Sequence, residues 1–472
     1  MRRRDLLTTL ACAPLLGAAT RAGAAPHTTP RLLTAAPATA AAAGETALPV
    51  WAYDGLTPGP VLRFRRRDVL DIELLNRLPD ATTIHWHGIR LPNAMDGVPH
   101  LTQAPVAPGE RFRYRFALPD AGTFWYHPHL GTPEQVERGL AGALIVEDDA
   151  PPPVDEDRVV VLDDWRLDAQ GRVSEDFYRF HDVAHAGRLG QRLTANGALA
   201  PEWPVRTGQR WRLRLINAAN ARIFGLEIPA GLRGWLIARD GVPASQAVPW
   251  EGQLLLGPGM RADLIIDLDA PGRFALTDTN SREPVALGHF VVDGASSRRA
   301  RPAPRPAAFE PLPEPDLAQA LEHTIAIGGG ARSRQGWPDD PPEAREARRQ
   351  RRAAGAREAD PAWTLNGKAH VGDHAHHHAP EFRVARGRSV RLRLDNATAW
   401  WHPMHLHGHH FRVLARNGTP VPDAPWRDTV LMAPGDRLDI AFVADNPGRW
   451  MLHCHVLEHH TGGMGTVFEV EG

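Results

Sequence analysis

The sequence GRWMLHCHVLEHHTGGM occupies residues 448–464, near the carboxyl end of the chain. Its opening pattern occurs twice earlier, as GTFWYH at 122–127 and as GRFALT at 272–277. A Pro-Gly pair precedes each copy, at residues 108–109, 258–259 and 434–435. Recurrence at the spacing of a whole domain predicts three copies of one structural unit.

Several stretches alternate strictly between apolar side chains and, almost always, arginines. The apolar positions are Phe112, Tyr114 and Phe116, then Trp211, Leu213 and Leu215, then Val390, Leu392 and Leu394. A period of two with one apolar face is typical of half-buried strands. We therefore expect three similar β-domains at 45–150, 156–295 and 317–472, separated by proline-rich linkers at 151–153 and 301–315.

Composition excludes several function classes. The chain has 472 residues, of which 43% are hydrophobic, and its 54 Lys and Arg residues nearly balance its 55 Asp and Glu residues. This near-neutral balance argues against a nucleic-acid-binding protein. No apolar run approaches the roughly 20 residues that a membrane-spanning helix needs.

The amino-terminal residues 1–24 have the plan of an export signal. A basic cluster at 2–4 is followed by an apolar stretch at 6–19 and by small residues at 22–24. The adjacent arginines favour a twin-arginine-type signal peptide, and an ordinary secretory signal is the alternative. We expect a periplasmic or secreted protein. The remaining chain keeps one cysteine, Cys454, which cannot form an internal disulfide.

Histidines occupy matching positions in the first and third copies. They follow Asn76 and Asn396 at offsets of nine and eleven residues, where the second copy has Leu226 and Ile228 after Asn217. The resulting His-x-His pairs are His85 with His87, His127 with His129, His405 with His407, and His453 with His455. On a strand each pair points to one face, and imidazole binds copper, zinc, iron or nickel. One pair alone could be a surface or core feature, but four predict a cluster of several metals.

A second ligand set surrounds the lone cysteine. His402, Cys454, His459 and Met464 offer two imidazoles, a thiolate and a thioether. Trigonal His₂Cys with a weak axial Met is the blue-copper arrangement used in electron transfer. The alternative is a buried inert thiol. Because His453 and His455 flank the cysteine, one tripeptide would join the two metal sites.

These motifs resemble the multicopper oxidase family, in particular bacterial laccase-like enzymes and periplasmic copper-efflux oxidases. The resemblance implies an all-β chain of three cupredoxin-like Greek-key β-sandwich domains in tandem. It also implies four copper ions. His402, Cys454, His459 and Met464 would bind the type 1 copper, and His85 and His405 the type 2 copper. The type 3 pair would be bound by His87, His127, His129, His407, His453 and His455.

Two further residues are candidates for proton transfer, and Cys454 for electron transfer. Asp96, nine residues after His87, matches an acid that family members place near the trinuclear site, although a turn-forming Asp-Gly is the alternative. His460 stands where close relatives often carry Glu. Imidazole could take over the proton delivery, since its pKa is nearer neutrality.

Two segments match no ligand motif. Residues 331–362 lack methionine, unlike the methionine-rich inserts of efflux-type oxidases. We interpret them as a solvated helix that could cover the type 1 site, or as a disordered loop. A histidine cluster follows at His370, His374, His376, His377 and His378. It could capture copper ions or form an exposed loop without function.

The leading hypothesis is an oxidase that takes single electrons from phenols, aromatic amines or Cu(I) and reduces O₂ to water. The alternative is a copper-binding or tolerance protein without oxidase turnover. A structural protein would lack the ligands, and a two-domain nitrite reductase would lack the third domain. Since both ligand sets lie in one chain, we expect a monomer.

Overall fold

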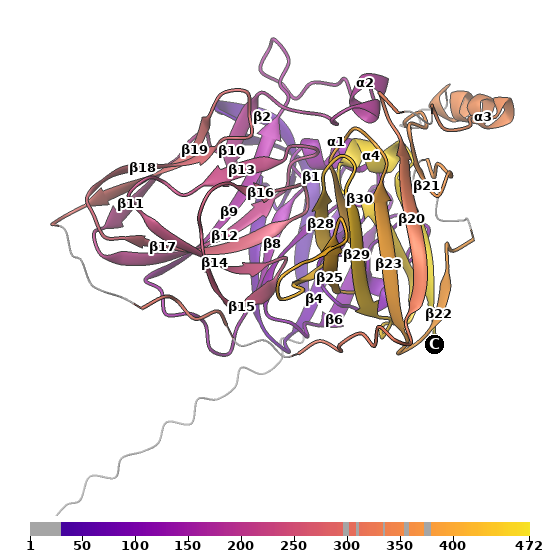
Figure 1. The fold of residues 1–472 in the computed structure, drawn as a ribbon. Coiled ribbons are helices and arrows are strands. Elements are labelled where there is room, and N and C mark those ends of the chain that lie inside the picture. Colours follow the sequence, from indigo (N-terminus) through magenta and orange to yellow (C-terminus); the bar gives the residue numbers. More distant parts are fainter. Residues whose placement is uncertain (1–29, 296–301, 308–310, 334–335, 354–357, 372–378) are drawn as a thin grey trace, which may run out of the picture.

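A computed structural model describes residues 30–295, 302–307, 311–333, 336–353, 358–371 and 379–472. The predicted export signal and His374, His376, His377 and His378 lie outside these residues. The described chain is built mainly of strands in six sheets. The sheets form three pairs, and the strands of each pair come from one of three successive stretches of the chain. Figure 1 shows the three resulting pairs of sheets packed together, which confirms the predicted all-β class.

The first unit pairs the sheets β2-β1-β4-β6 and β3-β8-β7-β5. Its first strand begins ahead of residue 45, where the sequence predicts the first domain to start. Its elements are β1 Arg31–Ala42, β2 Glu45–Tyr53, β3 Gly59–Arg65, β4 Val69–Asn76, β5 His85–His87, the 3₁₀ turn η1 Asn93–Met95, β6 Arg111–Ala117, β7 Gly122–His127, α1 Thr132–Glu137 and β8 Gly142–Glu147.

The second unit pairs the sheets β10-β9-β12-β17-β14-β15 and β11-β19-β18-β13-β16. Its elements are β9 Glu156–Trp165, α2 Phe180–Ala184, β10 Arg192–Ala195, β11 Glu202–Arg206, β12 Gln209–Asn217, β13 Phe224–Glu227, β14 Arg233–Arg239, β15 Val242–Pro249, β16 Leu254–Leu256, β17 Arg261–Leu268, β18 Gly272–Asp278 and β19 Val285–Asp293.

The third unit pairs the sheet β21-β20-β23-β29-β25-β26, with β27 beside β25, and the sheet β22-β31-β30-β24-β28. Its elements are β20 Leu321–Gly329, α3 Pro342–Ala353, β21 Trp363–Leu365, β22 Arg383–Ala385, β23 Ser389–Asn396, β24 His402–Leu406, β25 Phe411–Arg416, β26 Thr419–Pro420, β27 Trp426–Arg427, β28 Thr429–Met432, β29 Arg437–Val443, β30 Gly448–Cys454, α4 Leu457–Thr461 and β31 Gly465–Glu471. Helix α3 supplies the predicted helix within 331–362.

The three repeated asparagines explain why the sequence repeats. Each is fully buried at the end of a strand, and its backbone oxygen accepts a hydrogen bond from the Gly of the Pro-Gly pair. The Asn76 amide also donates to Asp80 O and Val106 O, at 2.8 and 2.9 Å. Asn217 and Asn396 make equivalent bonds to two backbone carbonyls each. One side chain therefore closes the same loop in each unit, since buried backbone carbonyls need partners.

The core joins the first and third units. One apolar cluster contains Trp86 of the first unit together with Met404 and Trp450 of the third. A separate cluster fills the second unit. The chain therefore packs its two histidine-bearing units against each other, which brings β5 and β24 together.

Strand β12 differs from the prediction of a half-buried strand. Arg212 and Arg214 are 2% exposed, and the alternating Leu213 and Leu215 are also buried, so both faces of the strand are covered. The guanidinium of Arg212 lies 2.6 Å from Asp263, and that of Arg214 lies 2.7 Å from Asp157. Buried charges are tolerated where they are paired. The alternating pattern therefore belongs to a strand that is covered on both faces.

Candidate metal centre

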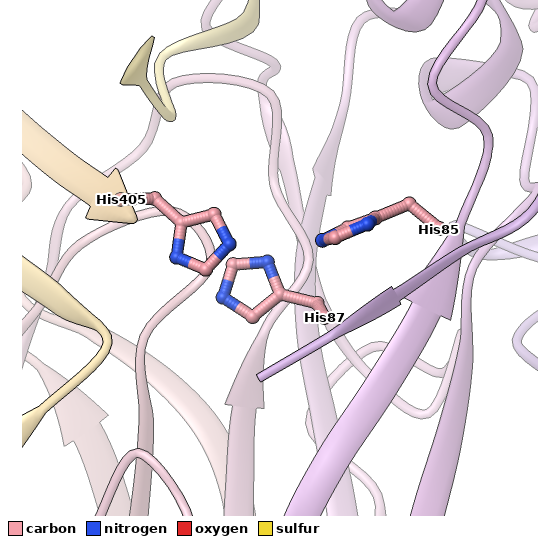
Figure 2. A group of neighbouring side chains, drawn as sticks. All are labelled: His85, His87 and His405. Carbon is pink, nitrogen blue, oxygen red and sulfur yellow. The ribbon is translucent and has the colours of Figure 1, made fainter. Parts of the chain in front are cut away.

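Histidines of the first and third units meet at the interface between these units. The rings of His87 and His405 stack with centroids 3.8 Å apart, and those of His85 and His407 stack at 4.1 Å. Figure 2 shows His85, His87 and His405 pointing toward one another from facing elements. The predicted juxtaposition of the two units thus forms one buried histidine cluster.

The eight histidines fall into overlapping groups whose ligand atoms all lie within 4.8 Å of one another. The groups are His85, His87 and His405; His87, His127 and His455; and His129, His407 and His453. Two groups of three plus the pair of His85 and His405 match the type 3 and type 2 sets that the resemblance implies.

The second nitrogen of several rings is already held by the protein. Nδ1 of His85 donates to Asp96 O at 2.8 Å, Nδ1 of His127 to Pro128 O at 2.8 Å, and Nδ1 of His405 to Asp428 O at 2.9 Å. These bonds fix the tautomer and leave Nε2 as a lone-pair donor. Within the part of the chain that the structure describes, the buried Nε2 atoms of these three histidines have no hydrogen-bond partner. Such orphaned atoms are those that a metal ion would satisfy.

Burial keeps the imidazoles neutral. It lowers the pKa of His87, His127, His129, His402, His405, His407, His453 and His455, and neighbouring histidines lower most of these values further. Metals bind the neutral imidazole, so no proton need be displaced from these rings.

The second ligand set also converges. Sγ of Cys454 lies 3.5 Å from Nδ1 of His402 and 3.7 Å from Nδ1 of His459. The outer nitrogen of His402 lies 2.8 Å from Thr398 Oγ1, and Nε2 of His459 donates to His185 O at 2.7 Å. Both Nδ1 atoms therefore face the sulfur.

A buried methionine is bonded to this site through its backbone, and the pKa of the site's thiol is shifted. Met464 is fully buried, and its backbone bonds to both His459 and Cys454. Burial raises the pKa of the Cys454 thiol. Since a bound cation deprotonates a coordinating thiol, the site is suited to a metal and poorly suited to a free thiolate.

The two candidate proton-transfer residues lie beside the histidine cluster. Asp96 is 1% exposed, and its Oδ2 accepts a hydrogen bond from Nδ1 of His407 at 2.9 Å. Its Oδ1 lies 3.2 Å from Nδ1 of His85, so it contacts two members of different groups. The His460 ring lies 4.4 Å from that of His453 and 5.3 Å from that of His129.

The turn interpretation of Asp96-Gly97 also holds. Gly97 has φ of +79°, and a Cβ there would lie 1.8 Å from Ile84 O. Only glycine fits this position. The Asp-Gly pair therefore makes the turn that carries the Asp96 carboxylate to the histidines.

Sequence reasoning missed Asp428 and Arg261. Oδ1 of Asp428 lies 3.4 Å from Nε2 of His87, and the carboxylate binds the Arg261 guanidinium at 2.7 and 2.6 Å. Arg261 is fully buried and its charge lowers the pKa of Asp428. The repeated Pro-Gly-x-Arg turn could have singled out Arg261, whereas no motif marks Asp428.

Comparison with known proteins agrees with this geometry. Two family models, both described as multicopper oxidase, match residues 34–151 and 344–472. The crystal structure of a multi-copper oxidase from Pseudomonas thermotolerans is 32% identical, with a TM-score of 0.81 over 94% of this chain and 99% of that chain. The chain belongs to the multicopper oxidase family.

Other multicopper oxidase relatives cover a similar extent. The multicopper oxidase MmcO of Mycobacterium tuberculosis is 29% identical over 446 residues, which are 88% of this chain and 82% of the relative. The crystal structure of Lac15 from a marine microbial metagenome is 34% identical, with a TM-score of 0.72 over 94% of this chain and 100% of that chain.

Family membership makes this chain an oxidoreductase and implies four coppers of types 1, 2 and 3. The donor atoms described above fit that requirement, because imidazole and thiolate suit copper. Among the described residues, no helix is long and apolar enough to cross a membrane.

Proposed function

We propose that this multicopper oxidase takes single electrons from a small aromatic donor or Cu(I) and reduces O₂ by four electrons to water. The observation that carries the proposal is the position of Cys454 between His453 and His455. Cys454 belongs to the group with His402 and His459, while its two neighbours belong to two different groups of the histidine cluster. Covalent bonds of one tripeptide therefore join the two sites.

The ligand assignment follows the observed groups. His402, Cys454, His459 and Met464 would hold the type 1 copper, and the eight paired histidines would hold the other three. When bound, the coppers supply one-electron acceptance at the first site and O₂ reduction at the second. The protein contributes a buried donor set, because the histidines are buried and hydrogen bonds orient several of the rings.

Protons for water formation would come through Asp96 and His460. Asp96 also orients His407 by its hydrogen bond. His460 is 9% exposed, and its Nδ1 has no partner among the described residues. Burial lowers the pKa of His460 to about 4, so the ring rests as a neutral imidazole, whereas the sequence predicted a pKa nearer neutrality.

An aromatic donor would bind beside α2. A cleft of about 470 Å³ there is lined by Phe180, Trp337, Asp339, Asp340 and other residues. The rings of Phe180 and Trp337 lie 5.1 Å apart, and Trp337 is 53% exposed. Aromatic rings stack well on such surfaces.

The remaining predictions complete the proposal. Three domains would span 45–150, 156–295 and 317–472, with residues 1–24 directing export by the twin-arginine route to the periplasm or beyond. A monomer would suffice, because one chain supplies every ligand. Within residues 331–362, Trp337, Asp339 and Asp340 would line the donor cleft, and copper capture by the cluster from His370 to His378 stays a prediction.

Oxygen uptake by the copper-loaded protein tests the function. A phenolic donor and Cu(I) are supplied separately, and the phenol is tested with and without added Cu(II). Uptake with phenol alone identifies a laccase, and uptake with Cu(I) identifies a cuprous oxidase. No uptake from any donor contradicts the proposal and leaves a copper-binding protein.

A further inference from the structure

The cleft beside α2 is formed by two segments that are far apart in the sequence. Phe180 begins α2 of the second unit, while Trp337, Asp339 and Pro361 come from the segment of the third unit that carries α3. Figure 1 shows α2 and α3 at the same end of the molecule. Helix α2 also contacts α4, the helix that carries His459. The cleft therefore lies at the end of the molecule that holds the predicted type 1 site.

Trp363 connects this cleft to the predicted type 1 ligands. Its ring centroid lies 4.3 Å from that of His459 and 5.1 Å from that of His402. Its indole N–H donates to Val183 O of α2 at 2.6 Å. Trp363 also follows Pro361, a residue of the cleft, by two positions. One buried side chain therefore contacts both imidazoles and is attached to both walls of the cleft.

The outer nitrogens of these two imidazoles are already bonded to the protein. Nε2 of His459 donates to His185 O at 2.7 Å, and Nε2 of His402 lies 2.8 Å from Thr398 Oγ1. Both histidines are at most 1% exposed. Since a donor cannot form hydrogen bonds to these ring nitrogens, its electron must cross the protein from a binding place at the surface.

The aromatic wall of the cleft has the shape of a corner. The rings of Phe180 and Trp337 lie 5.1 Å apart at an interplanar angle of 52°. The two residues are 44% and 53% exposed. Aromatic faces stack with other rings and attract cations. The corner can therefore bind an aromatic ring on one face and an attached cationic group on the other.

The polar wall of the cleft is mainly acidic. The charged residues that line it are Asp339, Asp340, Asp360 and Arg345. Arg345 and Arg348 bind Asp340, at 3.3 and 2.5 Å. Arg352, outside the lining, binds Asp360 at 3.0 Å. Asp339 is exposed, and within the described part of the chain it has no ion pair or hydrogen bond. Its carboxylate, two positions from Trp337, is therefore available to a ligand.

We propose that this cleft binds aromatic donors that carry a positive charge, such as phenols or anilines with a protonated amine side chain. The donor ring would stack in the aromatic corner, and its ammonium group would face Asp339. Each donor gives one electron to the type 1 site and one proton to solvent, and it leaves as a radical. Four donors thus supply the four electrons that convert one O₂ and four protons to two waters. The inference rests on the proposed oxidase function and narrows its donor.

Three phenols with similar rings and different charges test this preference. At pH 7 tyramine is cationic, 4-ethylphenol is neutral and 3-(4-hydroxyphenyl)propionate is anionic. We expect kcat/KM of the copper-loaded protein to be about three- to tenfold higher for tyramine than for 4-ethylphenol, because cation–π and carboxylate contacts at exposed sites each contribute a few-fold. The value for the anionic phenol should be lower still, and added salt should reduce these differences.

Variants assign the preference to the two walls. We expect Asp339→Asn to raise the KM for tyramine about threefold and to bring the ratio of tyramine to 4-ethylphenol kcat/KM toward one. Trp337→Ala should raise the KM for all three phenols, since the stacking face is lost. Glu283→Gln is the matched control, because it removes an exposed carboxylate from the loop between β18 and β19. This control should keep the parent's ratio.

Phenethylammonium measures binding apart from turnover, because it has no phenolic hydroxyl to oxidise. Saturation-transfer NMR with the copper-loaded proteins gives its Kd. We expect the Kd to be about threefold higher in Asp339→Asn than in the parent and in Glu283→Gln. In Trp337→Ala the Kd should also exceed the parent's value.

The outcomes separate this inference from the proposed function. Equal kcat/KM for tyramine and 4-ethylphenol in the parent overturns the inference, and so does an equal Kd for phenethylammonium in the parent and Asp339→Asn. Oxidation of Cu(I) without oxidation of any phenol also overturns it, while the oxidase function stands. Absence of turnover with every donor, Cu(I) included, overturns the proposed function, and the Kd values then decide whether the cleft binds cationic aromatic molecules.

Discussion

The guanidinium of Arg261 donates two hydrogen bonds to the carboxylate of Asp428, at 2.7 and 2.6 Å, across the boundary between the second and third units. Both residues are at most 1% exposed. Arg261 also donates to Thr123 O of the first unit at 3.2 Å. The second unit has none of the predicted copper ligands, yet it supplies the charge that holds Asp428 beside His87 and His405.

Replacing Arg261 should destabilise the whole protein. In Arg261→Met the Asp428 carboxylate would be left buried without its partner, which costs about 3 to 5 kcal/mol. Chemical denaturation of the copper-loaded protein measures the change in the free energy of unfolding. Arg273→Ala is the control, because its pair with Glu202 is exposed and should change stability by no more than about 1 kcal/mol. Equal effects of the two variants would contradict the role of Arg261.

Asp96 should be needed for turnover more than for folding. Asp96→Ala removes the acceptor that orients His407, and we expect kcat to fall by about 10 to 100-fold. Steady-state oxygen uptake measures kcat, and metal analysis shows whether copper is lost as well. Asp445→Ala, at a partly exposed carboxylate outside the cluster, serves as the control. Full activity of Asp96→Ala would refute its assignment.

The Cys454 thiolate should be required for binding of one copper and for the blue colour of a type 1 site. In Cys454→Ser the type 1 site loses its thiolate, so we expect three coppers per chain in place of four and no intense thiolate-to-copper absorption. Metal analysis and visible absorption spectra test this. Retention of four coppers with unchanged colour would show that Cys454 is no ligand.

Glu137 should make stability depend on pH. Burial raises its pKa to about 8, and the nearby Asp164 and Glu458 carboxyls add to the rise while Arg188 opposes it. A carboxyl with a raised folded pKa binds its proton more tightly when folded. Stability from Glu137 is therefore complete below about pH 4.5 and is lost as pH rises toward 8.

Thermal unfolding across this pH window measures the effect. Relative to the parent, Glu137→Gln should lose less stability between pH 4.5 and 8, because its amide does not ionise. Parallel Tm curves for parent and variant would show that Glu137 does not carry the effect.

Much of the fold and the histidine cluster could be predicted from the sequence. The repeats marked by Asn76, Asn217 and Asn396 correspond to identical loop closures, and the His-x-His pairs lie together as expected. These features are local patterns, so the sequence displays them directly. For residues 331–362 the sequence left a helix and a disordered loop as alternatives, and the structure has helix α3 there.

Other features depend on packing between distant segments. Asp428 stands in no motif, and its contact with Arg261 joins residues 167 positions apart. The buried arginines of β12 look like a solvent-exposed face in the sequence, because the covering carboxylates come from other strands and another unit. The contact between α2 and His459 spans 274 positions and has no local signal.

The central claim is that one chain couples single-electron oxidation to four-electron reduction of O₂. The most direct test is the stoichiometry of donor oxidised to O₂ consumed, measured together with peroxide in the copper-loaded protein. The account predicts four donor electrons per O₂ and no accumulation of hydrogen peroxide. Two electrons per O₂ with peroxide as the product, or no consumption of O₂, would contradict it.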